Sequence, residues 1–87
     1  NILITGASRG FGQSTLRKLL EHGHRVVAGI RGGDKRLAEL FPSEIQRYGA
    51  RLSAVDLHLD RPEAFAEVER RVSELCSGRL DVLVNNA

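Results

Sequence analysis

Short runs of aliphatic residues alternate along this 87-residue chain with segments of helical periodicity. The aliphatic runs are Ile2–Ile4, Val26–Ala28, Leu52 to about Leu59, and Val82–Val84. Runs this short are typical of buried parallel strands, and helices between such strands form right-handed crossovers. We therefore expect residues 1–87 to form the N-terminal part of a single α/β domain whose remainder lies beyond this sequence, with the elements in the order β-α-β-α-β-α-β. The expected architecture is a doubly wound parallel sheet with strand order 3-2-1-4.

The ends of the expected helices are marked by residues that suit helix caps. Gly23 stands where the first helix needs a left-handed C-terminal residue, and Asp34 is expected to N-cap a second, short helix that Pro42 ends. Asp60 and Glu63 have the spacing of a capping box before the last helix. The apolar face predicted for that last helix consists of Phe65, Val68, Val72 and Leu75.

Three glycines, Gly6, Gly10 and Gly12, separate the first expected strand from the first expected helix. Gly6 permits a tight turn out of the strand. Gly10 permits the pyrophosphate of a ligand to approach the backbone at the helix N-terminus, where free N–H groups favour negative charge. Gly12 permits the helix to pack closely against the sheet. No Gly-Lys-Ser/Thr follows, so the pattern is not that of a P-loop.

Two segments of the chain match motifs of one known family. Thr5–Gly12 resembles the TGxxxGxG cofactor loop of the short-chain dehydrogenase/reductase family, and Asn85-Asn86-Ala87 resembles the start of that family's NNAG motif. The separation of the two motifs also matches, so the resemblance covers the whole chain. It implies a Rossmann-type sheet with a nicotinamide dinucleotide across the carboxyl ends of the strands.

The resemblance also assigns expected roles to individual residues. The phosphate-side loop is expected to be formed by Ser8, Arg9, Gly10 and Phe11, with Phe11 in place of the usual Ile beside the cofactor. Residues at both ends of the second motif, Asn85 and Ala87, would border the adenosine ribose. For Asn86 two roles stay open, one toward the cofactor and one in hydrogen bonds that brace neighbouring strands.

The end of the second strand indicates which nicotinamide cofactor is bound. Enzymes that use NAD usually carry an acidic residue there, which accepts hydrogen bonds from the ribose hydroxyls. Here Ile30 takes that position and Arg31 follows. The guanidinium groups of Arg31 and Arg9 could bind a 2′-phosphate, and no carboxylate would repel it. We therefore expect NADP(H) rather than NAD(H).

A further acidic residue is expected beside the adenine, after the third strand. Asp56 followed by Leu57 fits the family pattern, with Asp60 as the cap of the next helix. Counting back from Asn85 favours Asp60 for the adenine instead. The capping box that begins at Asp60 leads us to prefer Asp56, and the alternative stays open.

The expected activity is hydride transfer between the cofactor and an alcohol or carbonyl substrate, as the resemblance implies. The family's catalytic Ser, Tyr and Lys would lie beyond the fourth strand, and Tyr48 precedes the third. No catalytic residue is therefore expected within residues 1–87, which would form the cofactor-binding part of a longer reductase. A dinucleotide-binding module or sensor without catalysis is the alternative.

Composition excludes several other classes of protein. The net charge of +2 is too small to indicate nucleic-acid binding, and no apolar run approaches the roughly 18 residues of a membrane span. A single cysteine, Cys76, allows no internal disulfide, and the spacing of His22, His24 and His58 relative to it does not suit a metal site. We expect a cytoplasmic protein and, from the resemblance, a homo-oligomer.

Overall fold

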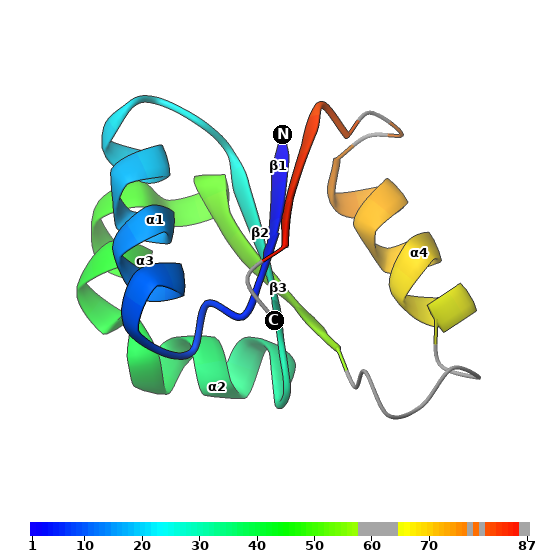
Figure 1. Cartoon of the computed structure of the whole chain (residues 1–87), viewed down its shortest axis with the longest axis horizontal. Helices are drawn as coiled ribbons and strands as arrows, with labels where there is room; N and C mark the ends of the chain where they lie inside the picture. Colours follow the sequence, from blue (N-terminus) through cyan, green and yellow to red (C-terminus); the bar gives the residue numbers. More distant parts are fainter. Residues whose placement is uncertain (58–64, 77, 79, 86–87) are drawn as a thin grey trace.

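A computed structural model describes residues 1–57, 65–76, 78 and 80–85. Its strands form one parallel sheet in the order β3-β2-β1-β4, which confirms the predicted order and places β1 in the centre. All carboxyl ends of the strands therefore lie at one edge of the sheet (Figure 1). The strands are β1 (Ile2–Thr5), β2 (Val26–Ile30), β3 (Leu52–Asp56) and β4 (Val82–Asn85).

The helices cover both faces of this sheet. Three of them lie on one side of the sheet and α4 lies on the other (Figure 1). The helices on the first side are α1 (Gly10–Glu21), α2 (Gly33–Leu40) and α3 (Pro42–Tyr48), which is followed by the short 3-10 helix η1 (Gly49–Arg51). The helix on the other side, α4, comprises Phe65–Leu75. No helix within the described residues has the length and apolar character that a membrane span requires.

Alternating side chains of the strands build a separate core on each face. The larger core packs Ile4, Val26 and Ala28 against the helices, with Leu16 from α1 and the fully buried Phe41 between α2 and α3. The core on the other face contains Val27 and Val55 from the sheet, with Val72 of α4 and Cys76 just beyond it. This arrangement follows from side chains pointing to opposite faces along a strand.

The C-terminus of α1 confirms the role predicted for Gly23. This glycine has a φ of 89°, and its N–H donates to the carbonyl of Leu20 at 3.1 Å. The next N–H, of His24, donates to the carbonyl of Leu19 at 3.1 Å, which completes a Schellman motif. The guanidinium of Arg51 also donates to the Leu20 carbonyl, at 2.6 Å, and thereby ties α1 to the residues before β3.

The beginning of α2 and the end of β3 differ from the predictions. Asp34 does not cap α2: Gly32 is the N-cap residue, and Asp34 lies in the first turn of the helix. The expectation was wrong because two consecutive glycines with positive φ, at 32 and 33, let the helix begin two residues earlier. β3 ends at Asp56 rather than near Leu59, and the predicted capping box at Asp60 lies outside the described residues.

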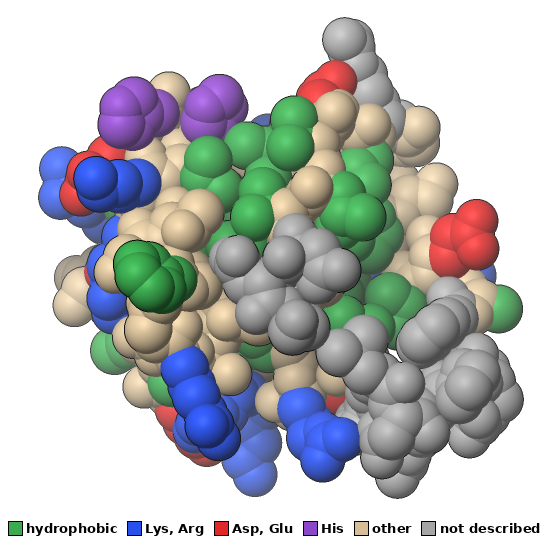
Figure 2. Space-filling view, in the orientation of Figure 1, with side chains coloured by type: hydrophobic (Ala, Val, Ile, Leu, Met, Phe, Trp, Pro, Cys, Tyr) green, Lys and Arg blue, Asp and Glu red, His purple; other side chains and the backbone are tan. Residues whose placement is uncertain are grey.

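The last strand, β4, exposes apolar side chains. It pairs with β1 on one side and stands at the end of the strand order, so no strand of the described residues pairs with its other side. Val82 is 47% exposed and Leu83 is 60% exposed. Figure 2 shows hydrophobic side chains gathered on this face of the molecule. An open apolar strand edge can pair with other chains.

We expect a chain of residues 1–87, taken alone, to self-associate through β4, and Leu83→Lys to reduce that association because charge on an edge strand opposes pairing. Light scattering during concentration and during thermal unfolding measures the effect. The control is Ser14→Lys, which adds the same charge on an exposed position of α1. A monomeric, cooperative thermal transition of the unmodified chain would contradict the prediction.

Candidate functional site

The loop between β1 and α1 is held by its own residues in a defined shape. Gly6 leaves the strand with a φ of 68°, as the prediction of a tight turn requires, and Ala7 is fully buried below the loop. Ser8 and Arg9 follow in the loop, and Arg9 is the N-cap residue of α1 with extended backbone. The Nε2 of Gln13 donates to the carbonyl of Ser8 at 2.8 Å. The loop is therefore fixed at both ends and in its middle.

Gly12 is required by a close approach of backbone to backbone. A Cβ at this position would lie 2.0 Å from the carbonyl oxygen of Gly6, far inside contact distance. A close approach was predicted, but its partner differs: the Cβ would meet the backbone of Gly6 and Ala7 in the loop and not the sheet. The missing side chain thus allows α1 to begin directly beside the end of β1.

Gly10 faces open space at the N-terminus of α1. A Cβ built there meets no atom within 4 Å, and φ is 42°. The first turn of the helix contains no acidic residue, and no side chain caps it. Its N–H groups and the positive end of the helix dipole are consequently not neutralised from within α1. This combination suits an anionic group such as a phosphate.

Two adjoining hollows lie along the carboxyl edge of the sheet. The larger has a volume of about 410 Å³ and runs along the loop itself. The smaller has a volume of about 190 Å³ and lies over the ends of β1 and β2. Gly6 and Ser8 line both hollows, so the two lie next to each other. The first is lined by Gly6, Ser8, Arg9, Gly10, Phe11 and Gly12, and the second by Thr5, Gly6, Ser8, Gly29, Ile30, Arg31 and Leu57.

The two arginines predicted to bind phosphate line these hollows. Arg9 lines the larger hollow and Arg31 the smaller, and both residues are exposed. Ile30, at the position where an acidic residue was considered, is 3% exposed and ends β2. No carboxylate lines either hollow among the described residues. The charged side chains that line these two hollows are therefore both positive.

Asp56 and Leu57 have different positions relative to the hollows. Leu57 is half-buried and lines the smaller one, and its N–H donates to the carbonyl of Ile30 at 3.1 Å. The carboxylate of Asp56 accepts a hydrogen bond from the N–H of Gly32 at 3.0 Å. Asp60, the alternative to Asp56, lies outside the described residues.

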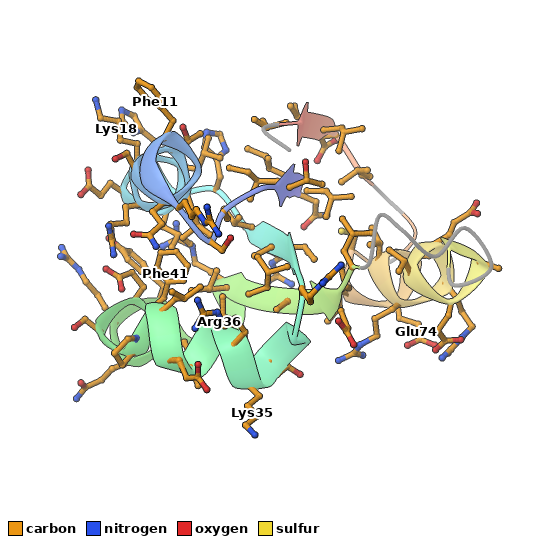
Figure 3. The ribbon with its side chains drawn as sticks, turned by 60° about the horizontal axis from the view of Figure 1, so that its bottom comes forward. Phe11, Lys18, Lys35, Arg36, Phe41 and Glu74 are labelled. Carbon is orange, nitrogen blue, oxygen red and sulfur yellow. The ribbon has the colours of Figure 1, made fainter. Side chains whose placement is uncertain are left out.

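The remaining predicted site residues are Phe11 in the glycine loop and three residues at the end of the chain. Phe11 is 89% exposed, and its ring points away from the body of the protein (Figure 3). Asn85 ends β4, in register with Thr5, so its backbone lies at the same sheet edge as the glycine loop. Asn86 and Ala87 lie outside the described residues.

Other chemistry-bearing side chains lie away from this edge. Cys76 is 2% exposed, and burial raises the pKa of its thiol, as expected for a packing residue. His22 is the C-cap residue of α1, and the ring of Tyr48 lies 5.2 Å from the guanidinium carbon of Arg51. No group of three or more His, Cys, Asp or Glu in the described part of the chain could hold a metal ion.

Two features of the site were not predicted from the sequence. One is the hydrogen bond from Gln13 that fixes the carbonyl of Ser8. The other is the hydrogen bond between Asp56 and Gly32. A glutamine one turn into a helix and an acidic residue after a strand are both common on protein surfaces. No sequence signal distinguished these two from solvated side chains.

Comparison with known proteins agrees with this geometry. The family model described as short chain dehydrogenase matches residues 1–87. The 3-oxoacyl-[acyl-carrier-protein] reductase FabG of Staphylococcus aureus is 41% identical over 86 residues, which cover 98% of this chain and 34% of that protein. L-rhamnose 1-dehydrogenase (NAD(P)(+)) of Azotobacter vinelandii is 37% identical over 93 residues, covering 99% of this chain and 34% of that protein.

Solved structures show the same arrangement of elements. A short chain dehydrogenase from Bacillus anthracis superimposes with a TM-score of 0.80 at 27% identity, covering all of this chain and 34% of that one. Serine dehydrogenase from Escherichia coli gives a TM-score of 0.77 at 34% identity, covering 99% of this chain and 37% of that one.

A glycine loop between the central strand and its helix, at the carboxyl edge of a 3-2-1-4 sheet, defines a Rossmann-type nucleotide-binding fold. The chain belongs to the short-chain dehydrogenase family, as the resemblance of its two motifs predicted. It spans about a third of the length of the curated relatives that it matches.

We expect Gly12→Ala to lower mainly the stability of the protein and Gly10→Ala to weaken mainly its binding of a dinucleotide. We expect Gly12→Ala to lower the free energy of unfolding by about 2 kcal/mol or more, because its Cβ must displace backbone. Gly10→Ala should cost only about 1–2 kcal/mol for its positive φ, yet should weaken binding of a dinucleotide strongly because the methyl group occupies the open space. Chemical denaturation and cofactor titration of the full-length variants measure the two effects. Equal stability of Gly12→Ala and the unmodified protein would contradict the packing argument.

Proposed function

We propose that this chain is the NADP(H)-binding part of a short-chain oxidoreductase. The observation that carries the proposal lies at the carboxyl edge of the sheet, where Arg9 and Arg31 line two adjoining hollows and no carboxylate of the described residues lines either one. The uncapped N-terminus of α1 adds a site for phosphate beside them. A dinucleotide carrying an extra 2′-phosphate matches this distribution of charge better than one without it.

The residues present fit such a cofactor. The open space above Gly10 would admit the pyrophosphate, the N–H groups of α1 would bind it, and Arg31 would bind the 2′-phosphate. Arg9 and Ser8 would lie along the phosphates, and Leu57 would offer an apolar surface to the adenine. When bound, the nicotinamide supplies or accepts a hydride.

The proposed substrates are small alcohols or carbonyl compounds. The names of the relatives support this, since they include a 3-oxoacyl-[acyl-carrier-protein] reductase and an L-rhamnose 1-dehydrogenase. Residues 1–87 would hold the cofactor, and the Ser, Tyr and Lys that the family uses in catalysis would come from the rest of the protein. A cytoplasmic, homo-oligomeric protein is part of the same proposal, as is the absence of nucleic-acid and membrane partners.

A dinucleotide-binding module without catalysis is the second candidate. Both candidates require the same cofactor site. They differ in whether NADPH, once bound to the full-length protein, is oxidised when carbonyl compounds are added.

We expect the full-length protein to bind NADPH more tightly than NADH. Arg31→Ala should weaken NADPH binding by about tenfold to a hundredfold, the range for a lost hydrogen bond to a charged group, and should change NADH binding far less. Titration calorimetry or cofactor fluorescence measures both constants.

Lys18→Ala removes an exposed cation of α1 that lines neither hollow, and serves as the control. Tighter binding of NADH than of NADPH by the unmodified protein would overturn the assignment of the cofactor.

A further inference from the structure

The turn between β2 and α2 carries Arg31 and is built from residues with little intrinsic preference for one shape. Gly32 and Gly33 follow Arg31 with φ angles of 100° and 57°. Consecutive glycines lose more conformational freedom on ordering than other residues, so such a turn needs contacts from outside to hold it. Those contacts come from the end of β3.

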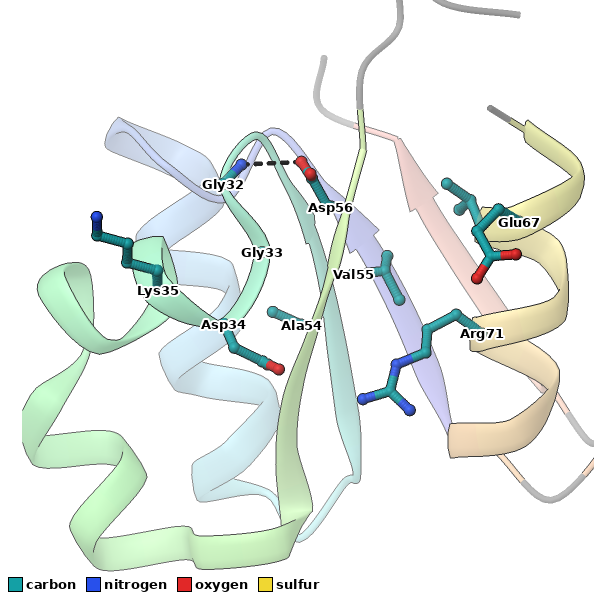
Figure 4. Close-up of a pocket in the computed structure, with 10 residues that line it drawn as sticks. Gly32, Gly33, Asp34, Lys35, Ala54, Val55, Asp56, Glu67 and Arg71 are labelled. Atoms are coloured by element: carbon teal, nitrogen blue, oxygen red, sulfur yellow. Dashed lines mark hydrogen bonds between the residues drawn. The ribbon is translucent and has the colours of Figure 1, made fainter. Parts of the chain in front are cut away.

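Asp56 and Leu57 hold the turn on both sides of Arg31. Before Arg31, the carbonyl of Ile30 accepts the N–H of Leu57 at 3.1 Å. After Arg31, the N–H of Gly32 donates to the Oδ1 of Asp56 at 3.0 Å (Figure 4). The backbone of Arg31 is thus fixed by one hydrogen bond at each of its neighbours.

The packing of Gly33 against β3 shows how close the turn lies to Asp56. A Cβ on Gly33 would come within 3.4 Å of both the Cβ and the backbone nitrogen of Asp56. Ile30 and Asp56 are also the last pair in the register of β2 with β3. The hydrogen bond from the Asp56 side chain to Gly32 therefore extends the contact between the two strands into the turn that follows β2.

The hydrogen bond between Asp56 and Gly32 places a carboxylate at the N-terminus of α2. The N–H that Asp56 accepts belongs to the N-cap residue of α2, where the backbone N–H groups and the helix dipole favour a negative charge. A carboxylate acceptor gives a stronger hydrogen bond than a neutral one.

We propose that Asp56 is a positioning residue that sets cofactor specificity: by holding the N–H of Gly32, it fixes the place from which Arg31 reaches a 2′-phosphate. This inference rests on the proposed preference for NADP(H). In this proposal Asp56 affects the cofactor by positioning Arg31, in addition to any contact that Asp56 makes with the adenine. An adenine contact would be common to both cofactors, whereas the action through Arg31 would affect only NADP(H).

The test compares Asp56→Ala with Asp56→Asn in the full-length protein. Both variants lose the negative charge, but only Asn keeps an oxygen acceptor for the N–H of Gly32. The ratio of the dissociation constants for NADH and NADPH is the readout, and NADH binding reports on correct folding. We expect Asp56→Ala to reduce the preference for NADPH by about tenfold, the effect of losing one hydrogen bond to a charged group, here the bond from the Gly32 N–H to the Asp56 carboxylate. We expect Asp56→Asn to retain most of the preference for NADPH.

A second measurement tests the route through Arg31. In an Arg31→Ala background, Asp56→Ala should no longer change the ratio, since residues that act through one another are not additive. An unchanged ratio in Asp56→Ala, an equal loss in Asp56→Asn, or full additivity with Arg31→Ala would each overturn the inference alone. If the unmodified protein does not prefer NADPH, the proposed cofactor and this inference both fail.

Discussion

The close approach of Gly12 to the carbonyl of Gly6 is the constraint on which the rest of the site depends. The Cβ of any side chain at position 12 would collide with that carbonyl oxygen. Because the contact is possible, α1 starts beside the end of β1 and directs its first N–H groups to the carboxyl edge of the sheet. Burial of Ala7 and the hydrogen bond from Gln13 then hold the loop in this shape.

Parallel pairing concentrates the candidate site at one edge. Since β1 is central and its neighbours run in the same direction, the residues after β1, β2 and β3 meet above the same end of the sheet. Residues as distant in the chain as Ser8, Arg31 and Leu57 line one hollow for this reason. The charge that lines the smaller hollow is decided at the end of β2, where an isoleucine and an arginine stand in place of an acidic residue.

The polar contacts that shape the site differ in kind from those that build the fold. The fold depends on buried aliphatic side chains, whose spacing in the sequence is visible as strand and helix periodicity. The strand order, the cap at Gly23 and the need for Gly12 could therefore be predicted. The start of α2 could not, because an acidic residue after two glycines fits either the N-cap or the first turn, and the sequence does not show that both glycines take a positive φ.

The sequence by itself determined the class of fold, the glycine loop and the presence of two arginines with no acid at the end of β2. These depend on local spacing and residue type, which act over a few residues. Only the tertiary structure decided that Asp56 binds the turn that carries Arg31, and that β4 exposes its apolar residues. Such contacts join residues far apart in the chain, so they depend on strand register and packing, which no local pattern specifies.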